Sequence, residues 1–540
     1  MPVFETKLDV KSDAYAKNRE DQLGKIGHLR MLEARAETAS EKRRPRFEER
    51  GQLTPRDRLA QLLDPGMPFL PLYNMASYCV DDPDRETSIP GGSTLAGIGY
   101  ISGTRCMIVV DDSGINAGAA TEMGFRKSLE AMKIALQNKL PFIHLVESAG
   151  ANLMQYKVEL WAHGGGVFCM LGRLSAAGVP TLTILHGPST AGGAYMPGMS
   201  DYNVGVKHNG MAALGGAALV QAATGEIADE RELGGTEMHA STTGLIEYLA
   251  EDDADGIRQM RDVVENLGWN EHCDPVPSRN FEEPVYDAEE ILGLVPTDYK
   301  IPYDSRELIA RLVDGSEFTD FKSRYGPNLI CVQAKIFGHP VGIVANNGPM
   351  GPDEAAKGAH FYQIIDQANI PLIFLNNITG YMVGTEYEQA GMIKHGSKMI
   401  QAAANIRVPK LTFYVGASYG AGNYGMAGYG YDPDFLFAWP GAMTGVMSGE
   451  SAAGTMETVA LNSAKRRGVK PDMEALAKQR AAIEKVFSSQ EDAFFTSGRL
   501  LDHGVVDPRD TRKILGFTLE TLWERKHRTL NPNAFGIGRM

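Results

Sequence analysis

Hydrophobic and polar positions follow different patterns in the first 50 residues and in the rest of the chain. Residues 13–50 are mostly polar, and aliphatic side chains recur at near-helical spacing from Leu23 to Leu32, which predicts a helical arm that packs against a neighbour. A further helix is expected after residue 51, because Thr54 is a favourable N-cap and Pro55 suits the first helical position.

From about residue 95 onward, short apolar runs alternate with amphipathic stretches. The strand-like runs include MIVVDD at 107–112, PFIHLVES at 141–148 and PTLTILHG at 180–187, and FRKSLEAMKIALQNK at 125–139 has helical character. Such alternation predicts an α/β fold in which helices connect the strands.

The chain contains an internal repeat. KLPFIHLVESAGANL at 139–153 resembles NIPLIFLNNITGYMV at 369–383, with Pro141 and Pro371 at an offset of 230. Further along, VPTLTILHGPSTAGGAY resembles VPKLTFYVGASYGAGNY, and we align Ala191 and Gly192 with Ala421 and Gly422 at the same offset.

A repeat this long indicates a duplicated domain. The segment 272–300 is rich in proline, and we expect the boundary there. The prediction is an arm at 1–50, an N-terminal domain at 51–285 and a C-terminal domain at 286–540.

Each half also carries two similar turns of small residues. One ends a predicted strand, as ESAGAN at 147–152 and NITGYMVG at 377–384, and the other leads into a helix, as GPSTAGGAY at 187–195 and GASYGAGNYG at 416–425. The second kind exposes backbone N–H groups at a helix N-terminus, which is the geometry of an oxyanion hole. We predict that such donors come from five residues: Ala191, Gly192, Gly193, Ala421 and Gly422. The alternative is that these glycines only let helices pack close to the sheet.

Composition and charge exclude several classes of protein. A formal net charge of −14 argues against a general nucleic-acid binder, although it leaves room for a local basic pocket for phosphates. Five scattered cysteines without a C-x-x-C pair indicate free thiols and no metal on this chain. The N-terminus lacks an apolar signal core and no apolar run is long enough to span a membrane, so we expect a cytoplasmic protein and leave the mitochondrial matrix open.

On these residues the chain resembles the carboxyltransferase (beta) subunits of biotin-dependent acyl-CoA carboxylases, and is more similar to the methylcrotonyl and geranyl branch than to the propionyl branch. The resemblance runs from GQLTPRDRLAQLLDPG at 51 almost to the C-terminus. It rests on several segments together: TAGGAY, AATGE at 222–226, ELGGTEMH at 232–239, GIVANNG at 342–348, NITGYMVGTEYEQAGMIKHGSKM at 377–399 and SYGAGNYGM at 418–426.

The resemblance implies two tandem crotonase-like domains, with acyl-CoA bound by the N-domain and biotin by the C-domain. It also implies a hexameric core, with sites between two chains, and a biotin carboxylase and biotin carrier (alpha) subunit as partner in an α6β6 assembly. Glu130-Ala131-Met132-Lys133 nearly matches a biotin-attachment motif, but it lies in a predicted helix rather than on a hairpin tip. Biotin is therefore expected on the partner subunit.

In this family the amides of Ala191 and Gly192 would stabilise the thioester enolate, and those of Ala421 and Gly422 the ureido oxygen of biotin. Further substrate-binding residues are expected at the two kinds of turn and beside them, namely Gly150, Ala151, Tyr195, Gly380, Tyr381, Val383 and Gly384. Because the cofactor supplies the base, we interpret the three candidate acids Glu147, Glu386 and Glu388 as structural or site-shaping.

Two departures and one substitution bear on the acyl group. The amino-acid sequences of segments 111–127 and 349–361 differ from those usual in the family. Methylcrotonyl-type chains carry Phe where this chain has Gly164 after His163, and geranyl-type chains resemble this one. Losing a ring makes room for a longer acyl tail. We therefore expect γ-carboxylation of a geranyl-CoA-like substrate, with a methylcrotonyl-CoA carboxylase beta subunit or another acyl-CoA carboxylase as the alternative.

Three other functions remain as alternatives. A crotonase-type hydratase would need two carboxylates placed at a water, and nothing in the sequence marks such a pair. A biotin-dependent decarboxylase subunit would use the same half-reaction in reverse. A non-catalytic CoA-binding scaffold would not need intact glycine turns in both halves.

Overall fold

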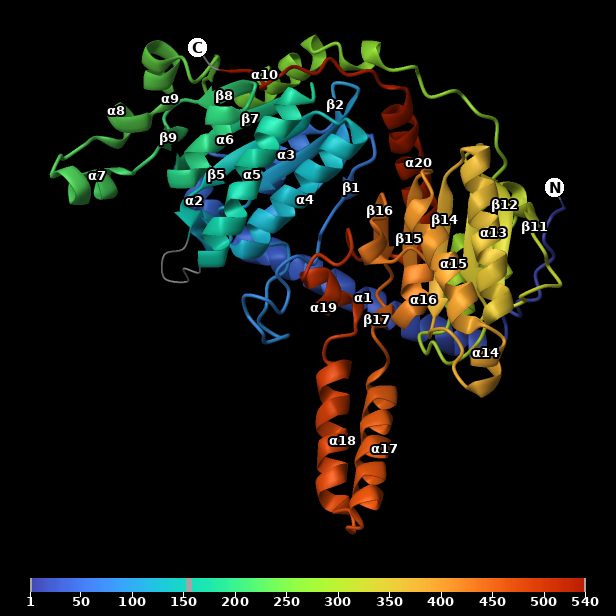
Figure 1. Ribbon diagram of the computed structural model, residues 1–540. Coiled ribbons are helices and arrows are strands. Elements are labelled where there is room, and N and C mark those ends of the chain that lie inside the picture. Colours follow the sequence, from blue (N-terminus) through green and yellow to red (C-terminus); the bar gives the residue numbers. More distant parts are fainter. Residues whose placement is uncertain (1, 152–157, 539–540) are drawn as a thin grey trace. The chain divides into compact units, whose positions relative to one another are not determined.

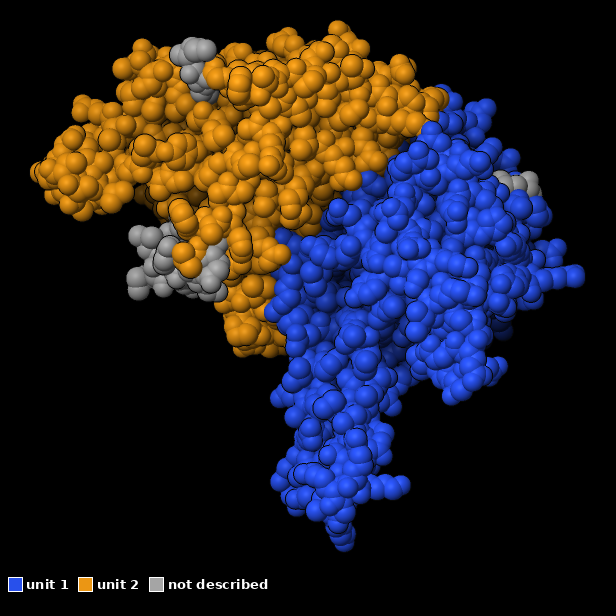
Figure 2. Space-filling model, viewed as in Figure 1, with its two compact units in different colours: residues 1–30, 278–519 blue, residues 31–277, 520–540 orange. Residues whose placement is uncertain are grey.

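The computed structural model describes residues 2–151 and 158–538, and the chain forms two compact units (Figures 1 and 2). The N-unit comprises residues 31–277 and 520–540, and the C-unit comprises residues 1–30 and 278–519. The boundary at 277 lies close to the expected one. No helix in the described part of the chain is long and apolar enough to cross a membrane.

Two assignments from the sequence differ from the structure. The arm is not a separate element, because helix α1 (Asp13–Glu41) contributes its first part to the C-unit and its second part to the N-unit. Residues 520–540 belong to the N-unit, not to the C-terminal domain. The physical reason is that Glu520 and Glu524 form ion pairs with buried Arg105 of the N-unit, at 3.0 Å each.

The N-unit is built on an eight-stranded sheet of order β1-β2-β3-β5-β7-β8-β10, with β9 paired to β7 (Figure 1). Its strands are β1 (Leu70–Pro71), β2 (Thr94–Ile101), β3 (Thr104–Asp111), β5 (Phe142–Ser148), β7 (Thr181–Thr190), β8 (Tyr202–Val206), β9 (Met211–Ala213) and β10 (Tyr248–Ala250). The short strands β4 (Ala119–Ala120) and β6 (Gly150–Ala151) pair separately. Its helices are α2 (Arg44–Glu49), α3 (Pro55–Leu62), α4 (Glu122–Asn138), α5 (Val158–Ala176), α6 (Tyr195–Met199), α7 (Ala217–Thr224), α8 (Glu230–Gly234), α9 (Thr236–Met238) and α10 (Asp253–Asn266).

The C-unit repeats this plan with a seven-stranded sheet of order β11-β12-β13-β14-β15-β16, with β17 paired to β15. Its strands are β11 (Phe318–Asp320), β12 (Leu329–Ile336), β13 (His339–Asn346), β14 (Leu372–Ile378), β15 (Lys410–Tyr419), β16 (Phe435–Ala438) and β17 (Met443–Gly445). Its helices are α11 (Ile291–Leu294), α12 (Ser305–Ala310), α13 (Pro352–Ala368), α14 (Thr385–Gln389), α15 (Met392–Asn405), α16 (Gly420–Gly425), α17 (Gly449–Arg467), α18 (Met473–Ser488), α19 (Ala493–Gly498) and α20 (Thr511–His527), the last of which continues into the N-unit.

The two sheets have the same pattern of antiparallel and parallel strand pairs. In each unit an antiparallel pair, β2–β3 or β12–β13, is followed by parallel strands. The parallel strands are buried on both faces, which explains why they read as continuous apolar runs in the sequence. The predicted duplicated α/β fold is therefore confirmed.

The sequence also predicts the helix after residue 51 correctly. The Thr54 hydroxyl accepts a hydrogen bond from the Asp57 N–H at 3.2 Å, and Pro55 is the first helical residue. Helix α3 then directs Leu62 and the charged side chain of Arg58 into the interior of the N-unit.

Arg58 is the centre of a buried charged network. Its guanidinium group contacts Glu147 at 2.6 Å and Asp253 at 2.8 Å, and Asp253 also contacts the ring of His186 at 2.8 Å. All four side chains are at least nine-tenths buried. Burial alone would raise the pKa of Asp253, but His186 and Arg58 together hold that pKa well below its usual value. The network ties α3 to the end of β5, to β7 and to the start of α10.

We expect Arg58→Met to lower the free energy of unfolding by about 3–5 kcal/mol, because it leaves two buried carboxylates without their cation. Urea denaturation followed by circular dichroism measures this change. The matched control is Arg44→Met in α2, where the ion pair is partly exposed and worth about 1 kcal/mol or less. Equal effects of the two substitutions would contradict the central position of Arg58.

Candidate active site

The first glycine turn follows the longest strand of the N-unit sheet. Strand β7 ends at Thr190, a single 3-10 turn spans Ala191–Ala194, and α6 begins at Tyr195. Ala191 has a left-handed backbone with φ 55°. The first N–H groups of a helical turn have no partner within it, and Ala191 and Gly192 at the start of this turn are exposed. The oxyanion donors that the sequence predicts at this turn would be these N–H groups.

The second turn has the same construction in the C-unit. Strand β15 ends at Tyr419, and Gly420, with φ 55°, begins α16. The residues that precede the turns have matching backbone angles, φ −109° and ψ 162° at Thr190 against φ −109° and ψ 150° at Tyr419.

The structure corrects the alignment of the two turns by one residue. In the sheet pairings, Ser148 and Ile378 occupy equivalent places at an offset of 230, but their partners Ser189 and Ser418 are 229 apart. Ala191 is therefore equivalent to Gly420. Gly192 then corresponds to Ala421 and Gly193 to Gly422. The offset changes because one residue fewer separates β14 from β15 than separates β5 from β7.

Close packing requires glycine at the third position of both turns. A Cβ atom on Gly193 would lie 2.9 Å from the Ser189 hydroxyl, and one on Gly422 would lie 2.5 Å from Ile378. The second position is open by comparison, since a Cβ on Gly192 would meet nothing closer than the Phe168 ring at 3.4 Å.

A cavity of about 810 Å³ opens beside the first turn. Carbon atoms dominate its lining, and its walls come from the loop before β2 and from helices α4 and α5. Six of the predicted site residues line it: Gly150, Gly164, Ala191, Gly192, Gly193 and Tyr195. Several residues of segment 111–127, whose sequence differs from that usual in the family, also line this cavity.

Gly164 lies on α5 within this wall. Among the described residues, no atom outside the helix's own backbone and the adjacent residues lies within 4 Å of the position that a Cβ would take there, so this part of the wall is open. The Phe168 ring, one turn further along α5, packs edge-on against Tyr195 with ring centroids 5.8 Å apart. The wall therefore combines a gap at Gly164 with aromatic side chains next to the first turn.

The predicted residues of the C-unit are more dispersed. Tyr381 packs against the buried core beside Gly396 and Gly425, while Val383 is 79% exposed. Gly380 and Gly384 have positive φ values of 134° and 124°. A cavity of about 570 Å³ is lined by Gly420 of the second turn together with Asn423 and Tyr424. Ala151 is described only by its backbone, in β6.

The structure places the acidic candidates and the motif resembling a biotinylation site. Glu147 is held by Arg58, whereas Glu386 and Glu388 are exposed on α14. Lys133 lies in the middle of α4, with its ammonium group 2.8 Å from Glu130. Its helical position agrees with the sequence argument against attachment of biotin there.

Sequence reasoning missed a pair of buried lysines. Lys127 donates hydrogen bonds to the carbonyl oxygens of Gly91 at 3.0 Å and Thr94 at 2.7 Å, and so fixes a loop that lines the cavity beside the first turn. Desolvation, together with nearby Arg56, lowers the pKa of Lys127 to about 7. Lys357, exactly one repeat later at an offset of 230, donates to Gly326 in the C-unit at 3.3 Å. The repeat itself was the signal that could have identified them.

Comparison with known proteins places the chain in a family. Residues 46–536 match the family described as the carboxyl transferase domain. The crystal structure of the P. aeruginosa geranyl-CoA carboxylase beta subunit is 46% identical, with a TM-score of 0.92 and all of both chains covered.

Two curated proteins of Mycobacterium tuberculosis are similarly related. The probable biotin-dependent acyl-coenzyme A carboxylase beta2 subunit is 45% identical, with 100% of each chain covered. The biotin-dependent 3-methylcrotonyl-coenzyme A carboxylase beta1 subunit is 43% identical over 94% of this chain and 95% of the relative.

The duplicated crotonase-like fold, with one glycine turn in each unit, defines a carboxyltransferase. The chain belongs to the carboxyl transferase domain family, and within it to the carboxyltransferase subunits of biotin-dependent acyl-CoA carboxylases.

Proposed function

We propose that this chain transfers a carboxyl group from carboxybiotin, carried on a partner alpha subunit, to the γ-carbon of a geranyl-CoA-like thioester. The observation that carries the proposal is the first glycine turn opening on a large apolar cavity with a gap at Gly164. The cavity lies within the range of volumes typical of small-molecule sites. Self-association to a hexameric core, within an α6β6 assembly, is part of the same proposal.

In the N-unit, the amides of Ala191, Gly192 and Gly193 would hold the thioester oxygen. A fixed donor is worth about 3 kcal/mol when negative charge develops on that oxygen in the transition state. For an α,β-unsaturated thioester this charge extends to the γ-carbon, which then becomes the nucleophile. Glu147 is held by Arg58 at 2.6 Å, so its carboxylate shapes the floor of the site from a fixed position.

In the C-unit, the amides of Ala421 and Gly422 would hold the ureido oxygen of biotin. The fit rests on the second turn, where Ala421 is exposed and Gly420 borders a cavity of about 570 Å³. When bound, carboxybiotin supplies both the CO2 and the base for proton removal, so no side-chain base is required. The two turns thus stabilise negative charge on two different oxygens.

The proposal is tested by co-expressing the chain with a biotinylated alpha subunit and supplying ATP and labelled bicarbonate. We expect more label to be fixed into geranyl-CoA than into methylcrotonyl-CoA. Fixation of label only into short acyl-CoAs would support the carboxyltransferase activity and contradict the geranyl-CoA-like substrate. CoA binding without label in any product, given a bound and biotinylated partner, would favour the scaffold; release of CO2 from a carboxylated thioester would favour the decarboxylase.

We expect Gly192→Pro and Ala421→Pro, which occupy equivalent places in the two turns, each to lower kcat by about 10²–10³-fold, because proline removes one amide donor. Gly192→Ala and Ala421→Gly keep the N–H and are the matched controls. Gly422→Pro is less suitable, because any side chain there collides with Ile378. Full turnover in folded proline variants would contradict the oxyanion assignment.

We expect Gly164→Phe to lower kcat/KM for geranyl-CoA by at least tenfold and to leave that for methylcrotonyl-CoA within about threefold, since a ring would fill the gap in the wall. Gly454→Phe is the control, because Gly454 is also a helical glycine with open space beside it but lies on α17. An equal loss with both substrates would show that the wall does not select acyl length.

A further inference from the structure

A tight turn of three left-handed residues lines the large cavity of the N-unit, just before β2. Gly91, Gly92 and Ser93 have φ values of 102°, 63° and 56°, and Thr94 then begins the strand. Glycine adopts this conformation readily, whereas Ser93 adopts it with a side chain and at a cost in backbone strain. Such strain persists only where the surrounding structure holds the backbone in place.

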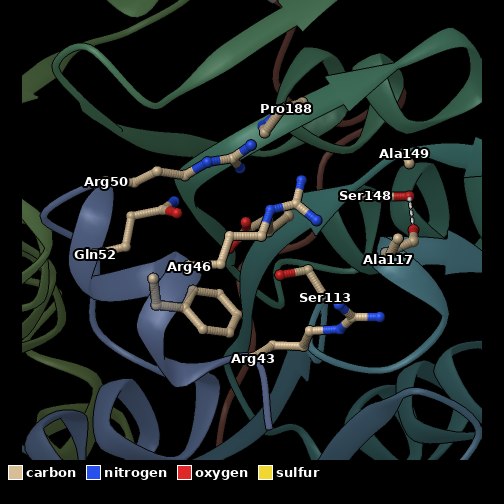
Figure 3. Close-up of a pocket in the computed structure, with 12 residues that line it drawn as sticks. Arg43, Arg46, Arg50, Gln52, Ser113, Ala117, Ser148, Ala149 and Pro188 are labelled. Atoms are coloured by element: carbon tan, nitrogen blue, oxygen red, sulfur yellow. Dashed lines mark hydrogen bonds between the residues drawn. The ribbon is translucent and has the colours of Figure 1, made fainter. Parts of the chain in front are cut away.

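The large cavity has two smaller neighbours. One, of about 130 Å³, lies beside α2 and meets the cavity at Ser148 (Figure 3). The other, of about 250 Å³, has a mostly polar lining that includes Asp81 and Asp82. Gly92 and Ser93 line both this second pocket and the large cavity, so the left-handed turn is part of the wall between them. A shift of the turn would join an apolar space to a polar one.

Lys127 holds both ends of this turn. Its ammonium group donates to the carbonyl oxygen of Gly91, the first residue of the turn, at 3.0 Å, and to that of Thr94, the residue after it, at 2.7 Å. The side chain comes from α4, where Gly124 packs so closely on the turn that a Cβ there would lie 2.8 Å from the Gly92 carbonyl oxygen. The lysine is 2% exposed, so both charge-assisted hydrogen bonds are shielded from water.

The surroundings of Lys127 make its charge sensitive to pH. Burial and the guanidinium group of Arg56 on α3 disfavour the ammonium, the carboxylate of Asp112 after β3 favours it, and the pKa of Lys127 falls to about 7. Asp112 is already engaged by Arg56 at 3.0 Å and by the Ser40 hydroxyl at 2.6 Å. The turn itself offers only neutral carbonyl groups. Near neutral pH the lysine therefore loses its proton, and its hydrogen bonds to the turn lose their charge assistance.

We propose that Lys127 is a positioning residue for acyl-CoA: its ammonium group holds the Gly91–Thr94 turn as a wall of the large cavity, and the affinity for acyl-CoA falls when the lysine loses its proton. This inference rests on the proposed function, because it assumes that an acyl-CoA occupies that cavity. Bound acyl-CoA then favours the protonated lysine, so binding takes up a proton near neutral pH. The lysine acts through the wall and not on the reacting atoms.

The test is calorimetric titration of the full chain with geranyl-CoA between about pH 6 and pH 9, in buffers of different ionisation enthalpy, which measures both the Kd and the protons taken up. Lys127 is protonated on the acidic side of this range, so the affinity is highest there. For the wild type we expect the Kd to rise about tenfold from the acidic to the alkaline limit, and roughly half a proton to be taken up near pH 7.5.

Three variants separate this role from a merely structural one. Lys127→Met should remove most of the proton uptake, raise the Kd about tenfold at pH 6 and make it nearly independent of pH. Lys357→Met is the matched control, because it removes the equivalent buried lysine from the C-unit and should leave the Kd for geranyl-CoA and the proton uptake unchanged. Ser93→Gly, added to Lys127→Met, should recover about threefold in affinity, because glycine adopts the left-handed turn without strain.

The inference is overturned if folded Lys127→Met keeps the wild-type Kd and proton uptake, or if Lys357→Met changes them as much. If Lys127→Met does not fold, the wild type decides, because a Kd that is independent of pH without proton uptake overturns the inference. Label fixation in the assay above separates the two proposals. Fixation together with a pH-independent Kd rejects only the role of Lys127, whereas Lys127-dependent binding without fixation rejects only the carboxyl transfer.

Discussion

The buried charge of Arg58 is the constraint on which the N-unit depends. A single guanidinium group joins α3, the end of β5 and the start of α10, and the carboxylate of Asp253 extends the connection to His186 on β7. Gly187, next to His186, must be glycine, because a Cβ there would lie 2.5 Å from the Glu147 side chain. Strands β5 and β7 of the N-unit are therefore held together close to their carboxyl ends, where the first turn begins.

The two units share the same arrangement of strands and turns, as a duplication predicts, but they differ in the residues around the turns. Both units keep the strand order, the turn after the longest strand and a buried lysine that holds a neighbouring loop. Around the turns they differ, since the first opens on an apolar cavity of about 810 Å³ and the second borders a smaller one near α18. A common scaffold with two surroundings is what two chemically distinct ligands require.

The sequence predicts the features that depend on local pattern. The sequence shows the alternating apolar runs, the N-cap at Thr54 and the long repeat. It also shows the glycines at positions where the structure has no room for a side chain. What it could not supply depends on contacts between distant segments: the pairing of Arg58 with Glu147 and Asp253, and the return of residues 520–540 to the N-unit. The one-residue change of offset was present in the sequence but became unambiguous only through the sheet register.

The path of the chain has a consequence for the order in which the protein matures. The polypeptide leaves the N-unit at residue 277 and rejoins it at residue 520. The buried guanidinium of Arg105 obtains its carboxylate partners from that returning segment, and Arg528 donates to the carbonyl oxygen of Trp269. During synthesis the first half therefore remains incomplete on the ribosome until the second half has been made. The N-unit, although most of it is synthesised first, can be completed only after the segment that follows the C-unit has been made.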